Sequence, residues 1–307
     1  MPKPTVLVLG ATGFIGTSLC HRLTQKNFEV ISFSTSQKGP KKTRHYQGDI
    51  RDQRSIGRLL AFKPHVVYLL AGISGQTNTD SLRDLSFAVN VKAQMDWLNS
   101  IVKQLPQTKV IFSSSRLEYG KPQHLPVDEK HPVAPLSTYG IHKLMVTQYL
   151  LYLHKKHGLD VTILRTSNPY GRPISSGSSK YNIINHFLGA ARKNGELTIF
   201  GSGKQLRDYL YIEDLIDVFE ILITKKNPAG EIYNVGSGQG ISIVNMAQKI
   251  VQISGGGRIK YLPWPRQEKS VETGDYISDI TKIKLALGWE PKTDLDRGIK
   301  LSLDNRE

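Results

Sequence analysis

The 307 residues, of which 39% are hydrophobic and 22% charged, have the composition of a soluble globular protein, and their number predicts two lobes around a sizeable core. Cys20 is the only cysteine, which excludes a disulfide framework and a cysteine-based metal centre, and we expect no bound metal. The formal net charge of +15 is spread along the chain, with clusters only at residues 38–44 and 154–157, so we interpret it as a solvated basic surface and expect no nucleic-acid partner.

The chain goes directly into the apolar run 6–9, without the charged and apolar leader that a signal peptide has. No apolar run approaches the ~18 residues that a membrane-spanning helix needs. We therefore expect a cytoplasmic protein without a membrane span.

Short apolar runs alternate with helical patterns up to residue 166. The runs are predicted strands at residues 6–9, 29–34, 65–70, 110–112 and 161–164, with a short strand ending at 48–50. The predicted helices include one that starts at Phe14, a long one at 82–105 and one that starts near Ser137. This order predicts an α/β fold with a Rossmann doubly wound parallel sheet, which binds ligands at the carboxyl ends of its strands.

Beyond Thr166 the alternation becomes less regular. We predict helices at 181–193 and 212–223, strands at 197–200 and 232–235, and a late helix that closes at 285–289 before Pro291. We therefore expect a dinucleotide-binding domain at 1–166, to which elements near 212–235 return, and a smaller, interleaved C-terminal substrate lobe at 167–307.

Three glycines separate the first strand from the first helix. Gly10 permits the tight turn, Gly13 lets a phosphate approach the backbone, and Gly16 lets the helix and the strand pack closely. The free amides at the helix start, near Phe14 and Ile15, would then hold a pyrophosphate. The loop predicts dinucleotide binding.

The end of the second strand lies where a Rossmann fold meets the adenosine ribose. Ser34 stands there in place of the acidic residue that selects NAD, and lysines 38, 41 and 42 with Arg44 follow it. These residues slightly favour NADP(H), although the basic cluster is equally well explained as a solvated loop. Asp49, before Ile50, is placed to accept a hydrogen bond from adenine, and a helix N-cap by Asp49 or Asp52 explains the spacing as well.

The fourth predicted strand ends in Leu70, Ala71 and Gly72, small or apolar residues against whose backbone a cofactor can lie. The fifth runs into three serines, of which Ser115 ends the strand at the same edge of the sheet. Tyr139 and Lys143 lie one turn apart on one face of the following helix. A lysine cation and an oxidised nicotinamide both favour the phenolate, so we predict Ser115, Tyr139 and Lys143 as the catalytic group.

At this point the chain resembles the extended short-chain dehydrogenase/reductase family, in particular its NAD(P)-dependent nucleotide-sugar epimerases and dehydratases. The resemblance covers nearly the whole length. It is carried by Gly10-Ala11-Thr12-Gly13-Phe14-Ile15-Gly16, Gly48-Asp49-Ile50, Leu70-Ala71-Gly72, Asn90, residues 113–120 and 139–143, Arg165 with Asn168-Pro169-Tyr170-Gly171, Arg207-Asp208-Tyr209, and Leu287-Gly288-Trp289-Glu290-Pro291.

By that resemblance Ser115, Tyr139 and Lys143 form the catalytic triad, and Asn90 supports the active-site water and backbone geometry. The resemblance implies a nucleotide diphosphate sugar as substrate, met by residues of the second lobe: Asn168, Phe200 and Arg207, with Asn182 and Arg266 as weaker candidates. Arg207 has an independent rationale, because a guanidinium fork matches a pyrophosphate. The helices at 82–105 and 137–157 resemble those that pair in family dimers, so we expect a homodimer.

One departure narrows the reaction. Dehydratases of the family carry an acidic pair directly after the catalytic hydroxyl, where this chain has Arg116 and Leu117. Glu118 is one position off, and in a strand-like segment it would face the other way. We therefore expect a nucleotide-sugar 4-epimerase that acts through a 4-keto intermediate with bound NAD(P), and the resemblance to epimerases favours NAD. The alternatives are an NADPH-dependent 4-keto-6-deoxysugar reductase and, more remotely, a non-catalytic NAD(P)-sensing protein.

Overall fold

The computed structural model describes residues 4–74, 80–172, 182–225 and 229–304. The chain divides into two compact units. Unit 1 comprises Met1–Glu118, Ser137–Arg165 and Ile216–Tyr233, and unit 2 comprises Tyr119–Leu136, Thr166–Leu215 and Asn234–Glu307. Residues 119–136, which a boundary at 166 would assign to the first domain, cluster with unit 2.

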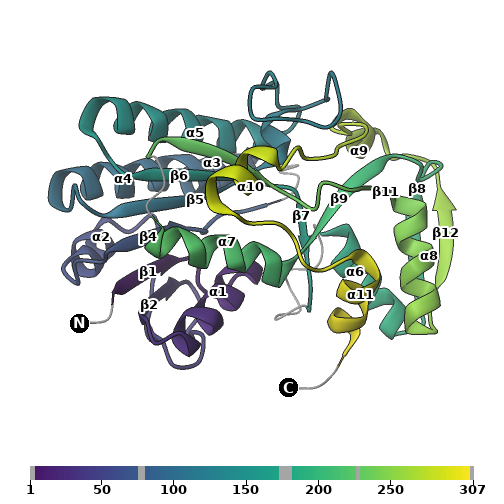
Figure 1. Ribbon diagram of the computed structural model, residues 1–307, viewed down its shortest axis with the longest axis horizontal. Helices are drawn as coiled ribbons and strands as arrows, with labels where there is room; N and C mark the ends of the chain where they lie inside the picture. Colours follow the sequence, from purple (N-terminus) through teal and green to yellow (C-terminus); the bar gives the residue numbers. More distant parts are fainter. Residues whose placement is uncertain (1–3, 75–79, 173–181, 226–228, 305–307) are drawn as a thin grey trace. The chain divides into compact units, whose positions relative to one another are not determined.

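A seven-stranded sheet organises unit 1 (Figure 1). Its strands lie in the order β10-β6-β5-β4-β1-β2-β3, and β1 pairs in parallel with both β2 and β4. Their bounds are β1 (Thr5–Leu9), β2 (Glu29–Ser34), β3 (Arg44–Gln47), β4 (Val66–Leu69), β5 (Lys109–Ser115), β6 (Val161–Thr166) and β10 (Glu231–Val235). This order confirms the predicted Rossmann sheet and puts the loop after β1 at the point where the winding reverses.

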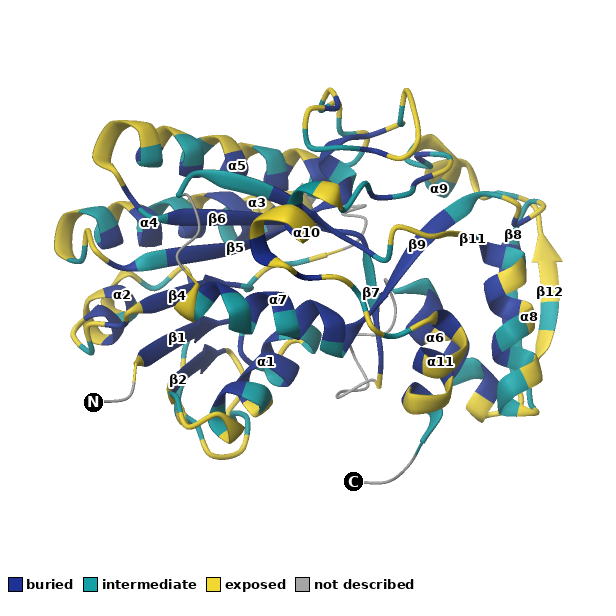
Figure 2. Cartoon of the chain, in the orientation of Figure 1, coloured by how far each residue is buried: buried dark blue, intermediate teal, exposed yellow. Residues whose placement is uncertain are grey.

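The central strands are buried along their whole length, as the dark strands of Figure 2 show for β1, β4 and β6. A parallel sheet is covered on both faces, so its strands are continuous apolar runs. The covering helices of this part of the chain are α1 (Phe14–Gln25), α2 (Gln53–Leu60), α4 (Ala93–Gln104), α5 (Thr138–His157) and α7 (Ile212–Thr224). Trp97 of α4 is fully buried, and its indole donates to the Ile50 carbonyl at 3.0 Å, which fixes the loop after β3.

The long helix predicted at 82–105 is present, and it contains a π-helical turn that the sequence did not predict. The segment consists of α3 (Asp80–Phe87), a π-helical turn η1 (Ala88–Lys92) and α4. A π turn is a single wider turn with i→i+5 hydrogen bonds inside an otherwise α-helical segment. Asn90 lies in this turn.

The described residues of unit 2 form two small sheets. One has the order β11-β9-β7 and the other pairs β12 with β8 in parallel. The strands are β7 (Asn168–Tyr170), β8 (Glu196–Phe200), β9 (Leu206–Tyr211), β11 (Gly240–Ser242) and β12 (Arg258–Leu262), and the helices are α6 (Ile183–Arg192), α8 (Ile243–Ser254), α9 (Arg266–Ser270), α10 (Thr281–Leu287) and α11 (Leu295–Leu303). A three-ten turn, η2 (Arg116–Glu118), ends the first segment of unit 1 before residue 119. Tyr181, the expected start of α6, lies outside the described residues.

No helix in the described part of the chain combines the length and the apolarity that crossing a membrane requires.

Candidate active site

The glycine loop has the backbone geometry that its spacing predicts. Gly10 has φ +88°, a conformation that L side chains rarely adopt, and a Cβ there would lie 2.5 Å from the Ala71 amide nitrogen. A Cβ on Gly16 would lie 2.3 Å from the Gly10 carbonyl oxygen. Glycine at position 16 therefore lets the first turn of α1 pack onto the end of β1, and glycine at position 10 lets the turn pass against residues 70–71.

The start of α1 fits a phosphate group. Gly13 is the N-cap of α1 and makes no side-chain cap hydrogen bond, whereas Ser137 caps α5 by accepting from the Gly140 amide at 3.1 Å. The first turn of α1 also carries no acidic residue. Uncapped amides and the positive end of the helix dipole suit the pyrophosphate of a dinucleotide.

Hydroxyl groups gather where the adenosine ribose is expected. Ser34 ends β2, is only 8% exposed, and accepts a hydrogen bond from the Ser36 amide at 3.3 Å. The Ser36 hydroxyl lies 3.1 Å from that of Thr12 in the glycine loop. Lysines 38, 41 and 42 are exposed, while the Arg44 guanidinium lies 4.4 Å above the Phe62 ring and is held there by stacking.

Asp49 is not a helix cap. Its carboxylate accepts from Arg51 Nε at 2.9 Å and Arg51 Nη2 at 2.7 Å, and this pairing holds the pKa of Asp49 below its ordinary value. The N-cap of α2 is Asp52, which accepts from the Arg54 amide at 3.0 Å. An adenine contact by Asp49 stays a prediction.

Side chains from the π turn and α4 hold the backbone that follows β4. Asn90 accepts from the Ile73 amide at 2.7 Å and donates to the Ile73 carbonyl at 2.8 Å. Gln94 donates to the Ala71 carbonyl at 2.8 Å. Gly72 is exposed, and a Cβ there would lie 3.2 Å from Asn90 Oδ1. Asn90 and Gln94 therefore fix the path of residues 71–73, which we expect the cofactor to lie against.

Tyr139 and Lys143 lie in the first turns of α5. Lys143 is 7% exposed, and its ammonium donates to the Ser113 carbonyl at 2.6 Å. The same nitrogen lies 4.5 Å from the centre of the Phe112 ring and 5.5 Å from that of the Tyr139 ring. The lysine thereby joins the end of β5 to the face of α5 that carries Tyr139.

Burial moves the pKa values of the pair in opposite directions. Desolvation raises the pKa of Tyr139 to about 12, and the negative charge of Glu118 adds to that rise. Desolvation lowers the pKa of Lys143 to about 8, and Glu118 opposes the fall. Lys143 therefore keeps its proton at neutral pH, and the phenol keeps its proton as well until further positive charge is placed beside it.

Ser115 ends β5 as predicted. It is 8% exposed, and its Oγ accepts from the Leu117 amide at 3.1 Å. That bond leaves the hydroxyl proton of Ser115 available for an oxygen of a ligand.

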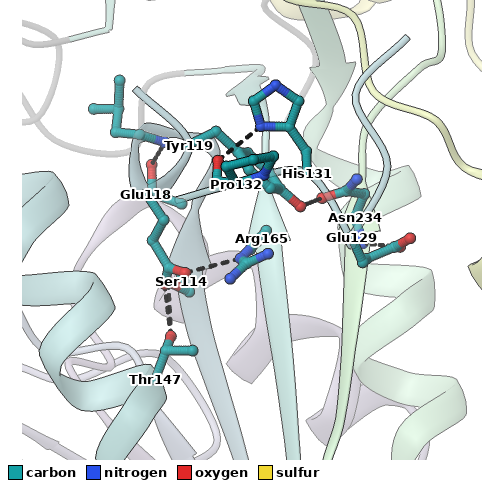
Figure 3. A network of polar contacts seen from close by, with 11 residues as sticks. Ser114, Glu118, Tyr119, Glu129, His131, Pro132, Thr147, Arg165 and Asn234 are labelled. Atoms are coloured by element: carbon teal, nitrogen blue, oxygen red, sulfur yellow. Dashed lines mark hydrogen bonds and ion pairs between the residues drawn. The ribbon is translucent and has the colours of Figure 1, made fainter. Parts of the chain in front are cut away.

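The expectation that Glu118 continues a strand is wrong. Residues 116–118 form the three-ten turn η2, which rotates Glu118 into the interior, where it is 0% exposed (Figure 3). Its carboxylate pairs with Arg165 Nε at 2.8 Å, accepts from Thr147 Oγ1 at 2.6 Å and accepts a short hydrogen bond from Ser114. Both carboxylate oxygens are engaged, so Glu118 is not placed to give a proton to a ligand.

In unit 2, Arg207 of β9 has an acidic partner that sequence analysis missed. The guanidinium pairs with the carboxylate of Glu272 and donates to the Gly274 carbonyl at 2.6 Å. Arg207 is 7% exposed. No short sequence motif links Arg207 to Glu272, because the two residues are 65 positions apart. A diphosphate that binds Arg207 therefore has to compete with Glu272.

Asp208, next to Arg207, holds three segments of unit 2 together. Its fully buried carboxylate accepts from the backbone amides of Ser237 at 2.6 Å, Gly238 at 3.2 Å and Ser278 at 3.0 Å. We assign Asp208 to positioning β9, and hence Arg207. Its place directly after a candidate ligand-binding arginine is the sequence signal that could have identified it.

The other predicted substrate residues contact neighbouring residues of unit 2. Asn168 donates to the Asp208 carbonyl at 2.8 Å, and Asn182 is the N-cap of α6. The Phe200 ring packs 5.7 Å from that of Trp264, and Arg266 is exposed at the start of α9. Asn182 thus has a structural role in the helix, and contacts of these residues with a ligand stay predictions.

Three comparisons place the chain among known proteins. Residues 6–236 match the model of the NAD dependent epimerase/dehydratase family. A Methanocaldococcus jannaschii protein that is provisionally named UDP-glucose 4-epimerase is 31% identical to this chain over 304 residues. The alignment covers 96% of each chain. The crystal structure of Thermotoga maritima UDP-glucose 4-epimerase with UDP-glucose has a TM-score of 0.88 and 27% identity, covering 97% of each chain. A mouse dTDP-D-glucose 4,6-dehydratase is 26% identical, covering 97% of this chain and 87% of its own.

Proposed function

Since the chain belongs to the NAD dependent epimerase/dehydratase family, a branch of the extended short-chain dehydrogenases/reductases, we propose that it is a nucleotide-sugar 4-epimerase. The observation that carries this proposal is the arrangement at the end of β5, where Lys143 of α5 is bonded to the Ser113 carbonyl beside Ser115 and stands one turn from Tyr139. The similarity to epimerases over the whole length supports it.

In the proposed reaction Tyr139 takes the proton of the sugar 4-hydroxyl and later returns it. The Ser115 hydroxyl donates to the reacting oxygen, and the Lys143 ammonium lowers the pKa of the phenol and binds the cofactor ribose. The nicotinamide, when bound, supplies the hydride acceptor and an additional positive charge. Rotation of the 4-keto sugar between two hydride transfers inverts C4.

The residues after Ser115 argue against dehydration. Leu117 has no group that can transfer a proton, and the carboxylate of Glu118 is already shared by Arg165, Thr147 and Ser114. Elimination of water needs an acid or base that reaches the sugar. The proposal therefore excludes the 4,6-dehydratase reaction of some family members.

A panel of nucleotide sugars tests the proposal, whichever sugar is the substrate. Because hydride returns in every cycle, we expect UDP-, GDP-, CDP- or dTDP-hexoses to interconvert with their 4-epimers while no net reduced cofactor accumulates. Epimers are measured by chromatography and reduced cofactor by absorbance. Stoichiometric consumption of NADPH on a 4-keto-6-deoxy sugar, without epimers from any hydroxy sugar, would instead assign the protein as a reductase.

For the cofactor, we propose that NADP(H) is tolerated and slightly preferred over NAD(H). Support comes from Ser34 and Ser36, whose hydroxyls stand where a carboxylate would repel a 2'-phosphate, and from the exposed lysines 38, 41 and 42.

The Ser34→Asp variant should shift the preference toward NAD. We expect its dissociation constant for NADP to rise at least about tenfold while that for NAD changes little, because one close charge repulsion corresponds to more than about 1.4 kcal/mol. Fluorescence titration with both cofactors measures this. Ser34→Asn is the uncharged control of similar size and should keep its NADP affinity. Strong rejection of NADP by the unchanged protein would mean that Ser34 does not discriminate.

We also propose a homodimer that forms through α5 and α3. Large apolar side chains on these helices are exposed in unit 1: Ile141 by 45%, Met145 by 37%, Tyr152 by 47% and Phe87 by 45%. Ile141, Met145 and Tyr152 follow helical spacing and so share a face of α5. Exposed apolar stripes of this kind are typical of interfaces between subunits.

A further inference from the structure

We propose that Glu118 is a positioning residue of the active site, whose buried carboxylate joins the end of strand β5 to helix α5 and strand β6 and thereby sets Ser115 against Tyr139 and Lys143. The inference rests on the proposed function for its catalytic part only. Glu118 itself is placed too deep to touch a ligand, because 0% of its side chain is exposed. Figure 3 shows its carboxylate in contact with Arg165, Thr147 and Ser114.

The geometry links three elements through one carboxylate. Oε1 accepts from Thr147, one turn beyond Lys143 on α5, and from Ser114, the neighbour of Ser115 on β5. Oε2 accepts from Arg165 on β6, whose side chain is 3% exposed. Lys143 and Thr147 share a face of α5, so the two polar links from this helix to the end of β5 lie one above the other.

A buried ion pair of this kind is a poor source of stability, because the cost of desolvating two charges offsets their attraction. In some proteins buried ionic groups instead specify one arrangement of the elements that they join. Here the arrangement specified is the distance between the strand that ends in Ser115 and the helix that carries the catalytic pair.

Charge is the second contribution of Glu118. The charged and titratable groups that face it are Arg165 on β6 and Lys143 and Tyr139 on α5. Its negative charge raises the pKa of Lys143 against the desolvation that lowers it to about 8. It also raises the pKa of Tyr139. Neutralising Glu118 therefore lowers both pKa values, and Lys143 then loses its proton at a lower pH.

Two variants distinguish the positioning role of Glu118 from the effect of its negative charge. Thr147→Val keeps the Glu118–Arg165 pair and removes only the hydroxyl link to α5, whereas Glu118→Gln keeps the shape and removes the charge. We expect each to lower kcat about tenfold or more with KM changed less than about threefold, because the reacting groups and not the substrate contacts are displaced. In Glu118→Gln the alkaline limb of the kcat profile should also move to lower pH.

Thr108→Val is the matched control. Thr108 is likewise a buried threonine of unit 1, whose hydroxyl donates to the Pro64 carbonyl at 2.7 Å, away from Glu118. We expect Thr108→Val and Thr147→Val to lower the melting temperature by similar amounts, and Thr108→Val to keep native kcat. Equal kcat in both threonine variants would overturn the positioning role.

A readout that needs no sugar keeps this inference separate from the proposed reaction. Because the Lys143 ammonium is expected to bind the cofactor ribose, the affinity for NAD(P) should fall as pH rises through the pKa of Lys143. Fluorescence titration from pH 6 to 10 should place this fall at lower pH in Glu118→Gln than in the native protein. An unmoved profile contradicts the electrostatic role even if no nucleotide sugar is turned over. If Glu118→Gln does not fold, the kcat of Thr147→Val decides the matter.

Discussion

A Tyr139→Phe variant should fold as the native protein does and epimerise its substrate at least about 100-fold more slowly, because no other group is proposed to take the proton of the sugar hydroxyl. The phenyl ring keeps the packing of Tyr139 beside Lys143, 5.5 Å from its ammonium, so the melting temperature and cofactor affinity should change little. Initial rates at saturating substrate, together with a thermal melt, measure both parts of the prediction.

The pH dependence follows from the same two groups. Burial raises the pKa of Tyr139 to about 12 and lowers that of Lys143 to about 8. Proton removal from the phenol becomes easier as pH rises, whereas the lysine charge that assists it is lost above about pH 8. The native rate should therefore rise toward pH 8 and fall above it.

Tyr149→Phe provides the control on the same helix. Its hydroxyl donates to Asn99 at 2.5 Å and has no part in the proposed reaction, so this variant should keep native turnover. Near-native turnover in a folded Tyr139→Phe protein would contradict the mechanism.

Replacing the two members of the Arg207–Glu272 pair should have opposite effects. Arg207→Ala should weaken binding of nucleoside diphosphates about 10- to 100-fold, since a hydrogen bond to a charged group contributes about 1.5–3 kcal/mol. Glu272→Gln should tighten it by about threefold or more, because the ligand no longer competes with a carboxylate for the guanidinium. Titration calorimetry with UDP, GDP, CDP and dTDP gives the dissociation constants.

A change in net charge alone could also raise the affinity for an anion. Glu196→Gln controls for it, because Glu196 is another carboxylate of unit 2 paired with basic residues, Arg258 and Lys260, each at 2.9 Å. The affinity of the Glu196→Gln variant for nucleoside diphosphates should equal that of the native protein. If neither Arg207→Ala nor Glu272→Gln alters binding, Arg207 is a structural residue that ties β9 to residues 272–274.

Local geometry made part of the site predictable. The glycine spacing determines the turn between β1 and α1, and the spacing of Tyr139 and Lys143 puts them on one helix face, so both features follow from short stretches of sequence. The alternation of apolar runs with helices likewise predicted the central sheet.

The errors concern residues whose environment comes from distant segments. Glu118 turns inward because Arg165, on another strand, pairs with it, and a pattern of alternating residues cannot show this. The partner of Arg207 lies 65 positions away. Strand β9 was not predicted, because an apolar run is the usual sign of a buried strand and β9 contains charged residues. Asp208 is buried there because backbone amides donate hydrogen bonds to its carboxylate.

The late position of β10 in the sequence affects how the sheet folds during synthesis. This strand borders β6 at the edge of the seven-stranded sheet, yet it begins only at residue 231 of 307. Until then β6 is an unpaired edge, and such edges are templates for pairing with other chains. The nascent N-terminal segment is therefore exposed to aggregation until β10 has been synthesised, and a fragment that stops at Thr166 would keep that exposed edge permanently.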